Sequence, residues 1–324
     1  MSENYYPTTL LEAVAYFSDA DRAHEFMTRM RWPVGVRCPR CRHGEHYFIK
    51  SRRVWRCKDC GRQFSVKTGT IMESSPLGLD KWLAAFWLIA NAKNGISSYE
   101  IARALGITQK SAWFVGHRVR HALATGSVEI LSGDVEVDEA SIGPVPNKIN
   151  RAAKARREQK PEHKRRTSFV TAVERGGAAR SKTVEPVRHE LHGHIHAHVE
   201  PGSTVHTDEN SAYDRLEGFE RTTVNHSAGE YVRGEAGIQS AENYNSLFKR
   251  CVKGAWICPS GEHLDAYLAE QDFRYGKRKA DDGLRAVSVA SSVSGKRLTY
   301  RECKKNTGRG PARGYDWRNH RGED

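Results

Sequence analysis

The sequence predicts a multidomain protein of the α+β class, with two small modules ahead of a larger α/β domain. Three observations lead to this prediction. Two Cys-x-x-Cys pairs lie within residues 31–70, apolar residues follow a helical period over residues 76–125, and short β-branched runs alternate with helical patterns from about residue 130. Such alternation of strands and helices is typical of an α/β layer. With 324 residues, 38% of them apolar, the chain is long enough for two or three modest domains.

The first segment, residues 1–30, is predicted to be helical and amphipathic. Its apolar residues recur at steps of three or four, namely Leu10, Leu11, Val14, Phe17, Ala23, Phe26 and Met27. The polar stretch from Met1 to Leu10 has no apolar core and so does not predict a signal peptide. The longest apolar run, Leu83 to Ala90, has eight residues and is too short to cross a bilayer. We therefore expect a cytoplasmic protein without a membrane partner, associated with the nucleoid if it is bacterial.

The two cysteine pairs predict a zinc ribbon over residues 31–70. Cys38-Pro-Arg-Cys41 and Cys57-Lys-Asp-Cys60 are separated by 15 residues, a hairpin length that lets the two turns meet. Zn²⁺ prefers four thiolates in a tetrahedron, so all four positions would be filled by protein and the zinc would be structural. A redox pair is the alternative. Basic and aromatic residues around the pairs favour contact with nucleic acid, whereas Cys251, Cys258 and Cys303 show no ligand spacing.

Residues 76–125 predict a helix-turn-helix DNA-binding domain. A helix over Asp80–Ala92 precedes a capping box of Ser97 and Glu100, Gly106 ends the second helix, and Thr108 is placed to cap a third. In this arrangement the last helix can enter a major groove. The candidate DNA contacts on it are Gln109, Lys110, Ser111, Arg118 and Arg120. A helical bundle without a DNA role is the alternative.

The charge balance also indicates a polyanionic partner. Lys and Arg number 52 against 39 Asp and Glu, which gives a net charge of +13. A basic insertion, residues 147–166, has nine Lys or Arg and two Glu. The final segment, residues 276–324, has 13 Lys or Arg and six acids and is predicted to be a largely disordered tail. Both segments are expected to bind backbone phosphates without sequence preference.

Acidic residues stand at the strand-like runs of residues 130–275. Val135–Glu139 is a short alternating strand that carries acids, and His206-Thr207-Asp208-Glu209 ends another apolar run, Ser203–His206. Glu242 opens a predicted helix. Buried acids are costly unless compensated, and two Mg²⁺ ions held by shared carboxylates compensate them well. Lys249 lies seven positions after Glu242, two turns along the same helix face, where it can hold a phosphate near the metals. The neighbours Glu139 and Glu209 compete locally for ligand positions.

Motif order now makes a family resemblance specific. The ribbon and helix-turn-helix are followed by Val-Glu-Val-Asp-Glu (135–139), Thr-Asp-Glu-x-Ser-Ala-Tyr (207–213), Val-Asn-His-Ser (224–227), Tyr-Val-x-Gly (231–234) and Glu-Asn-Tyr-Asn-Ser-Leu-Phe-Lys-Arg (242–250). This order, over residues 15–275, resembles the insertion-sequence DDE transposases of the ISXO2-like group. The resemblance implies an RNase H-like α/β catalytic domain with a central mixed sheet over residues 130–275.

The resemblance also implies site residues and an activity. Asp138, Asp208 and Glu242 match the metal-binding triad, Lys249 matches the helix lysine, and Cys38, Cys41, Cys57 and Cys60 match the zinc ligands. The implied protein is a DNA transposase that binds terminal inverted repeats and uses two Mg²⁺ or Mn²⁺ ions for DNA cleavage and strand transfer. Its partners would be double-stranded DNA, as element ends and target, and further copies in a homodimer or larger assembly. Gln239-Ser240-Ala241 and Asn245 depart from the family pattern, and Asn245 replaces a usual aromatic.

Other interpretations remain open. His194-Ile195-His196, within the cluster from His189 to His198, matches the signature of single-strand nucleases with a tyrosine nucleophile, although the run also fits a surface helix. A domesticated regulator would keep DNA binding and lose cleavage. A plain RNase or junction resolvase would need no DNA-reading front end. Asn225 and His226 are expected near the site, where His226 either positions substrate or makes a structural hydrogen bond.

Overall fold

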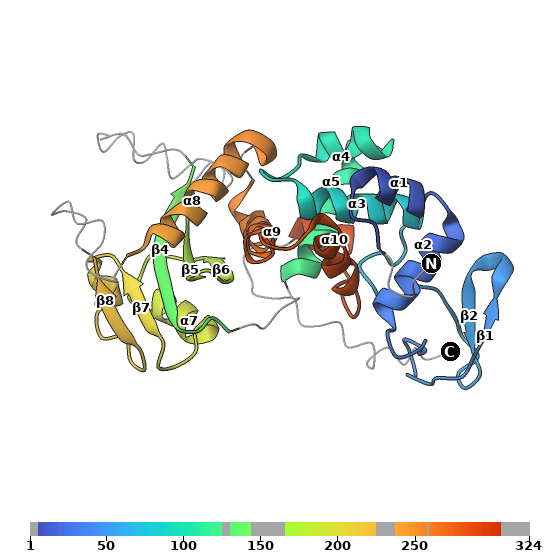
Figure 1. The fold of residues 1–324 in the computed structure, drawn as a ribbon, viewed down its shortest axis with the longest axis horizontal. Helices are drawn as coiled ribbons and strands as arrows, with labels where there is room; N and C mark the ends of the chain where they lie inside the picture. The colour runs from blue at the N-terminus through green and yellow to red at the C-terminus, as the bar shows by residue number, and fades with distance from the viewer. Residues whose placement is uncertain (1–5, 125–129, 144–165, 225–236, 258, 306–324) are drawn as a thin grey trace. The chain divides into compact units, whose positions relative to one another are not determined.

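The computed structural model describes residues 6–124, 130–143, 166–224, 237–257 and 259–305 (Figure 1). The chain divides into two compact units, one of Met1–Gly126 with Ala280–Asp324 and one of Ser127–Lys279. Apart from Arg166, the basic insertion lies outside the described residues, as do Asn225, His226, Cys258 and residues 306–324. No helix in the described ranges is long and apolar enough to cross a membrane.

The first unit is built around helix α3. This helix, Leu79–Asn91, is apolar on almost every side and buries Trp82, Phe86 and Ile89. A helix that is apolar all round must be covered on all sides. The other helices of the unit, several of which contact α3, are α1 (Leu10–Phe17), α2 (Ala20–Arg31), α4 (Ser98–Leu105), α5 (Gln109–Ala124), α10 (Asp282–Ser291) and α11 (Tyr300–Lys305).

The N-terminal segment is helical as predicted but consists of two helices. The Asp19 side chain accepts hydrogen bonds from the Asp21 and Arg22 amides, which starts a new helix. Phe17, like Ala23, Phe26 and Met27, is buried as the periodicity predicted. Leu11, in contrast, is 83% exposed, and Leu10 and Val14 are also exposed. The predicted apolar face was therefore wrong for most of helix α1.

The helix-capping residues predicted between α3 and α5 are confirmed. Ser97 and Glu100 form the reciprocal capping box of α4, with hydrogen bonds of 2.8 and 3.2 Å. Gly106 ends α4 with a φ of 59°, a conformation that favours glycine. The Ser111 amide donates to Thr108 Oγ1 across 3.2 Å at the start of α5.

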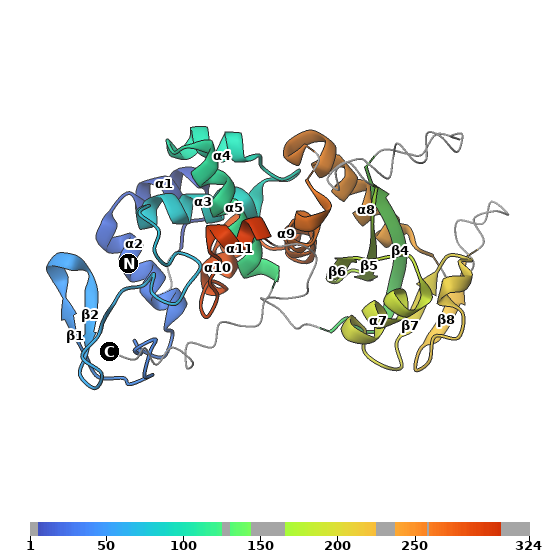
Figure 2. The ribbon, with the colours of Figure 1, turned by 180° about the vertical axis from the view of Figure 1, so that it is seen from behind.

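The prediction of a disordered C-terminal tail is wrong for residues 276–305. Asp281 caps α10, which buries Ala286, Val289 and Ala290 and contacts α3. Helix α11 lies against α5, beside α10 (Figure 2). A short amphipathic stretch therefore folds here, although the composition of the whole segment is basic and polar.

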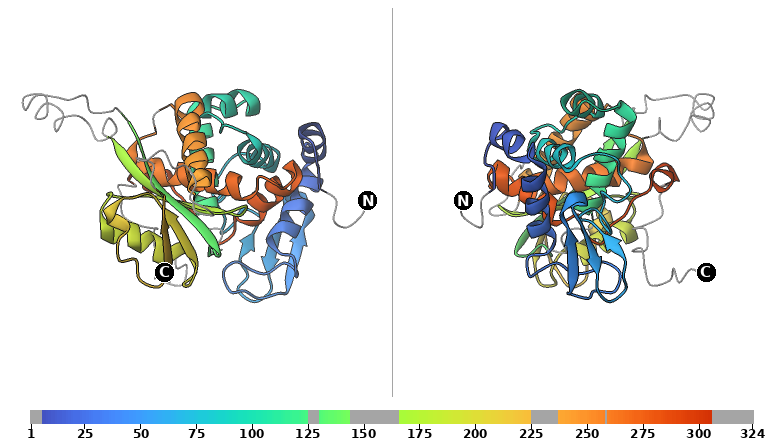
Figure 3. Two further views of the ribbon diagram at one scale, coloured as in Figure 1. Left: turned by 60° about the vertical axis from the view of Figure 1, so that its left-hand side comes forward. Right: turned by 90° about the vertical axis from the view of Figure 1, so that its right-hand side faces the viewer.

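A small antiparallel sheet follows α2, with strands β1 (His46–Ile49), β2 (Val54–Cys57) and β3 (Gln63–Phe64) in that order. The hairpin lies beside α2 (Figure 3). Trp55 is the centre of their contact, because its ring stacks on His24 of α2 and on Phe64 of β3. The cysteine turns are thus anchored to the helical part of the unit by aromatic packing.

The second unit contains the predicted central mixed sheet. Its strand order is β6-β5-β4-β7-β8, in which β5 is antiparallel to both neighbours and β4, β7 and β8 are parallel. The strands are β4 (Asp134–Ile142), β5 (Thr167–Glu174), β6 (Ala179–Thr183), β7 (Thr204–Thr207) and β8 (Glu220–Thr223). Four of them coincide with the short β-branched runs that predicted strands, Val135–Val137, Ser168–Val173, Thr204–His206 and Thr222–Val224. Edge strand β6 was not predicted, because its sequence is polar.

Helices cover both faces of this sheet. Helix α7 (Arg188–His198) lies on one face, and α8 (Gln239–Cys251) lies on the other with α9 (Leu264–Gly276) (Figures 1 and 2). Val135 and Val137 of β4 pack with Leu191 and Ile195 of α7. Alternate residues of a strand face opposite sides. Glu136 and Asp138 therefore face α8.

Candidate functional site

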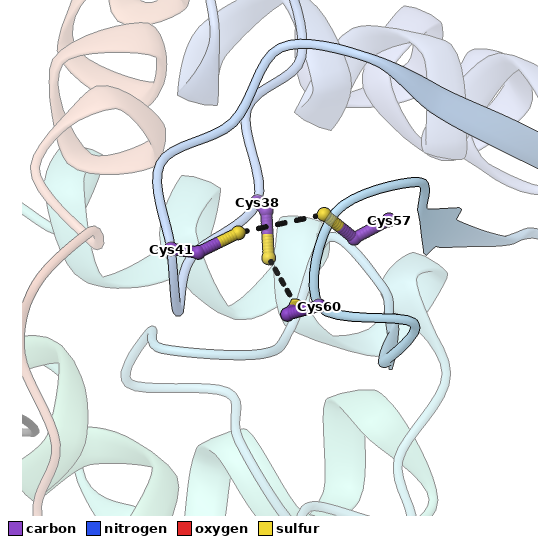
Figure 4. A group of neighbouring side chains, drawn as sticks. All are labelled: Cys38, Cys41, Cys57 and Cys60. Carbon is purple, nitrogen blue, oxygen red and sulfur yellow. Dashed lines mark hydrogen bonds between the residues drawn. The ribbon is translucent and has the colours of Figure 1, made fainter.

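The four cysteines converge as a metal site would require. Their Sγ atoms all lie within 4.8 Å of one another, with 3.7 Å between Cys38 and Cys60 and 3.4 Å between Cys41 and Cys57 (Figure 4). A tetrahedral site with Zn–S bonds of about 2.3 Å has S–S edges of about 3.8 Å. The four thiols are free, and Gly61 provides the positive φ of 68° for the second turn. The donor set therefore fits a structural Zn²⁺.

In the described ranges, this is the one group of three or more His, Cys, Asp or Glu ligand atoms within that distance. The predicted acids are more widely spread. Asp138 lies on β4, Asp208 directly follows the parallel neighbour β7, and Glu242 lies in the first turn of α8. Parallel strands end at the same edge of a sheet, which places the first two acids together.

Asp138 lies within electrostatic range of both other acids. Burial raises the pKa of Asp138, and the negative charges of Asp208 and Glu242 raise it further, against a hydrogen bond from Asn245 that lowers it. An acid in this setting is stabilised by a nearby cation, and its charged form is costly without one. The three carboxylates are hard oxygen donors of the kind that Mg²⁺ and Mn²⁺ prefer.

Asn245 is a site residue that the sequence did not identify as one. Its Nδ2 donates to Asp138 Oδ2 across 2.8 Å, and its Oδ1 accepts from Thr171 Oγ1 across 3.0 Å. Its spacing from Glu242 offered a signal, because residues three apart in a helix are neighbours on its surface. Asn245, which replaces the usual aromatic at this position, therefore makes a polar contact with Asp138.

Glu139, the competitor for Asp138, also lies close to the acids. Burial raises its pKa to about 7, and the charges of Asp208 and Asp138 add to this effect, while the nearby Tyr213 side chain lowers it. Asn210 Nδ2 donates to Glu139 Oε1 across 2.9 Å, and the Asn210 amide donates to Asp208 Oδ1 across 3.1 Å. Glu139 is thus linked to Asp208 through one residue.

Two further predicted positions are exposed. Glu209, the competitor for Asp208, is an exposed residue after β7. Lys249 is exposed in the last turn of α8, two helical turns after Glu242. An exposed ammonium group there is accessible to an anionic polymer.

The predicted DNA contacts on α5 divide into two groups. Lys110 is exposed, Ser111 belongs to the helix cap, and Gln109 Nε2 donates to Ser98 Oγ of α4 across 2.9 Å. Arg118 and Arg120 are only 7% and 4% exposed and cannot reach a DNA groove from these positions. This part of the prediction was wrong, because the C-terminal segment covers that part of α5.

Arg118 illustrates the covering contact. Its Nε donates to the Leu298 carbonyl across 3.1 Å, and its guanidinium stacks on the Phe114 ring at 4.4 Å. The segment that contains Leu298 was predicted to be disordered, so the sequence offered no reason to expect this burial. The amphipathic guanidinium is used here for packing rather than for phosphate binding.

The histidine cluster forms a helix rather than a strand. His194 is buried and its Nε2 contacts the Arg180 carbonyl at 3.1 Å, whereas His196 is exposed beside Phe219. Burial, with the charge of His198, lowers the pKa of His194 to about 3. Because one of these histidines faces the core and the other faces solvent, they do not share a ligand. The tyrosine-nuclease interpretation is therefore wrong.

Comparisons with known proteins agree with the motif order. Residues 130–276 match the model of the ISXO2-like transposase domain, and residues 18–63 match the transposase zinc-ribbon domain. The chain is 29% identical over 280 residues to an uncharacterized protein in the transposable element ISH50 of Halobacterium salinarum, over 78% of this chain and 89% of that protein. No solved structure matches the chain significantly.

Proposed function

Because the chain belongs to the insertion-sequence transposases with an ISXO2-like transposase domain and a zinc ribbon, we propose that it binds the terminal inverted repeats of its element. We further propose that it catalyses metal-dependent DNA cleavage and strand transfer. The observation that carries this proposal is the placement of the three acids: Asp138 on β4, Asp208 directly after β7 and Glu242 in the first turn of α8, where the charges of the last two act on Asp138. The mixed sheet with helices on both faces supports an RNase H-like catalytic domain.

The proposed chemistry assigns a role to each acidic group. When bound, two Mg²⁺ or Mn²⁺ ions would activate the attacking oxygen and stabilise charge on the leaving oxygen. Asp138, Asp208 and Glu242 would hold them, and Lys249 would hold a DNA phosphate beside them. Water first cleaves a phosphodiester at the element end and leaves a 3′-OH. That 3′-OH then attacks a target phosphodiester, so one P–O bond forms as another breaks.

The first unit supplies the proposed DNA reader. Its α4–α5 pair, with Gln109, Lys110 and Ser111 at the start of α5, would place these side chains against a major groove. The Cys38, Cys41, Cys57 and Cys60 cluster would hold a structural zinc that keeps the ribbon folded. Since two element ends must be joined, a homodimer or larger assembly on DNA is part of the proposal.

Cleavage and joining of labelled DNA that carries the flanking inverted repeats tests the function. With Mg²⁺ or Mn²⁺, we expect wild-type protein to generate 3′-OH ends and joined products, and Asp208→Asn to generate neither. Glu209→Gln is the matched control, because it changes the neighbouring exposed acid and should retain activity. Specific binding without cleavage in any protein would instead indicate a regulator. Cleavage by Asp208→Asn but not by Glu209→Gln would transfer the role to Glu209.

A further inference from the structure

Strand β4 carries a second buried acid, two residues before Asp138. Glu136 is 3% exposed and lies on the same face of the strand as Asp138, toward α8. A buried carboxylate is stable only when hydrogen bonds or opposite charges compensate it. The partners of Glu136 show what this acid does.

The carboxylate of Glu136 caps the N-terminus of α8. Its Oε2 accepts hydrogen bonds from the Ser240 and Ala241 amides at 2.6 and 3.2 Å. The helix has no cap of its own, because the side chain of its N-cap residue Ile238 makes no capping hydrogen bond. A carboxylate at this end satisfies free amides and complements the helix dipole.

The other oxygen of Glu136 is also engaged. Arg175 Nε donates to Oε1 across 2.8 Å, and Arg175 Nη2 donates to the Gly237 carbonyl across 3.0 Å. Arg175 therefore joins the acid to the backbone that leads into α8. With both oxygens committed, Glu136 serves as a helix cap rather than as a further metal ligand.

Asn245 makes a second side-chain hydrogen bond between α8 and β4. Its amide bridges Asp138 and Thr171, which are direct partners across the β4–β5 ladder. Asn245 and Thr171 are buried. Because the Thr171 hydroxyl donates to the amide oxygen, the amide nitrogen must face Asp138. One oxygen of Asp138, Oδ2, is thereby oriented.

We propose that Glu136 and Asn245 are positioning residues that hold α8 against β4, so that Asp138 and Glu242 keep a fixed separation before metal or DNA binds. Glu242 lies between the two contacts, one residue after Ala241 and three before Asn245. Asp138 and Glu242 repel each other without a cation, so α8 needs independent attachment on both sides of Glu242. The inference rests on the proposed function, because it assumes that these two acids are ligands.

Mn²⁺ binding to the full-length, zinc-loaded protein, measured by calorimetry, tests this role. We expect Asn245→Ala to weaken Mn²⁺ binding by about 10- to 100-fold, the range typical of residues that orient metal ligands. Thr171→Val keeps the side-chain shape and removes the hydroxyl that orients Asn245, so a smaller loss is expected, and Thr171→Ser should restore binding. Glu136→Gln should also weaken binding. The Mg²⁺ concentration for half-maximal cleavage should rise in the same order, with affinity for element ends unchanged.

Ser181→Ala is the matched control. Ser181 Oγ also connects a strand to α8, through Tyr244 Oη at 2.8 Å, but it does not contact the three acids. We expect this variant to lose stability and to retain wild-type Mn²⁺ affinity. If Asn245→Ala fails to fold by circular dichroism, Thr171→Val and its rescue by Thr171→Ser carry the test.

The outcomes separate this inference from the proposed function. Loss of Mn²⁺ binding in Asp208→Asn, with Asn245→Ala, Thr171→Val and Glu136→Gln all indistinguishable from Ser181→Ala, would overturn the positioning role alone. Unchanged Mn²⁺ binding and cleavage in both Asp138→Asn and Asp208→Asn would overturn the proposed function, whatever the positioning variants do.

Discussion

Tyr244 donates a hydrogen bond to Asp272 across 2.5 Å, and this contact joins α8 to α9 beneath the sheet. Ser181 donates to the same carboxylate from its hydroxyl at 2.7 Å and from its amide at 3.0 Å. Burial nevertheless raises the pKa of Asp272 to about 7, because it outweighs these hydrogen bonds. The helix that carries the proposed third acid is thus packed against an acid that titrates near neutrality.

This raised pKa predicts a stability that falls with rising pH. The folded state holds the Asp272 proton up to about pH 7, whereas the unfolded state releases it near the ordinary value of 3.8. Between these values the folded state binds more protons, so each pH unit removes up to about 1.4 kcal/mol of stability. Asp272→Asn should flatten this part of the profile. Urea unfolding between pH 4 and 8 measures it, and an equally steep profile in the variant would contradict the assignment.

Zinc removal should unfold the ribbon and leave the second unit, with its five-stranded sheet, intact. Since four thiolates supply most of the folding free energy of such a module, Cys57→Ser should reduce bound zinc from about one equivalent to near zero. Metal analysis after purification and near-ultraviolet circular dichroism follow this change, because Trp55 lies on the same strand as Cys57, two residues before it. Cys251→Ser is the control: it alters a buried cysteine outside the cluster and should retain zinc. Full zinc in Cys57→Ser would exclude that residue as a ligand.

Lys110 and Lys304 should both contribute to DNA binding. Their Nζ atoms lie 5.0 and 5.1 Å from the centre of the Tyr300 ring, so α11 adds positive charge next to the start of α5. Each phosphate contact adds about 0.9 to the slope of log affinity against log salt. Lys110→Ala and Lys304→Ala should each reduce that slope by about one without changing the melting temperature.

Arg118→Ala provides the contrast in the same experiment. Its side chain is buried on Phe114, so the variant should melt earlier. Fluorescence anisotropy against salt concentration, run beside thermal melts, distinguishes the two effects. An unchanged salt slope in both lysine variants would remove this end of α5 from the proposed interface.

Local signals account for what the sequence predicted well. The Ser97–Glu100 capping box, the Gly106 helix end and the cysteine turns are each encoded within a few neighbouring residues. The position of Asp138 on β4 and of Asp208 directly after β7 likewise follows from short local runs, whereas their role as metal ligands stays a prediction. None of these features depends on how distant parts of the chain pack.

Long-range packing explains what the sequence missed. The contact between Arg118 and Leu298 spans 180 positions, and no local pattern reveals that it buries the arginine. The bond from Asn245 to Asp138 spans 107 positions and depends on the placement of α8 along β4. Average composition over residues 276–324 likewise concealed α10, which is stabilised by α3 rather than by its own sequence.

Glu270 and Arg274 form a buried ion pair, and removing one of its members should destabilise the protein much more than removing a member of the more exposed Asp282–Arg285 pair on α10. Their 2.5 Å contact lies within α9, Glu270 is fully buried, and the guanidinium also lies 5.2 Å from the Trp256 ring. Removing one member of a buried pair leaves an uncompensated charge and costs about 3–5 kcal/mol. Glu270→Ala should therefore strongly lower the melting temperature of the second unit, which contains α9. Asp282→Ala, which breaks the 3.3 Å contact with Arg285 at a half-exposed site, should cost less than about 1 kcal/mol. Differential scanning calorimetry compares the two, and a similar loss in both variants would show that burial does not govern the contribution of these pairs.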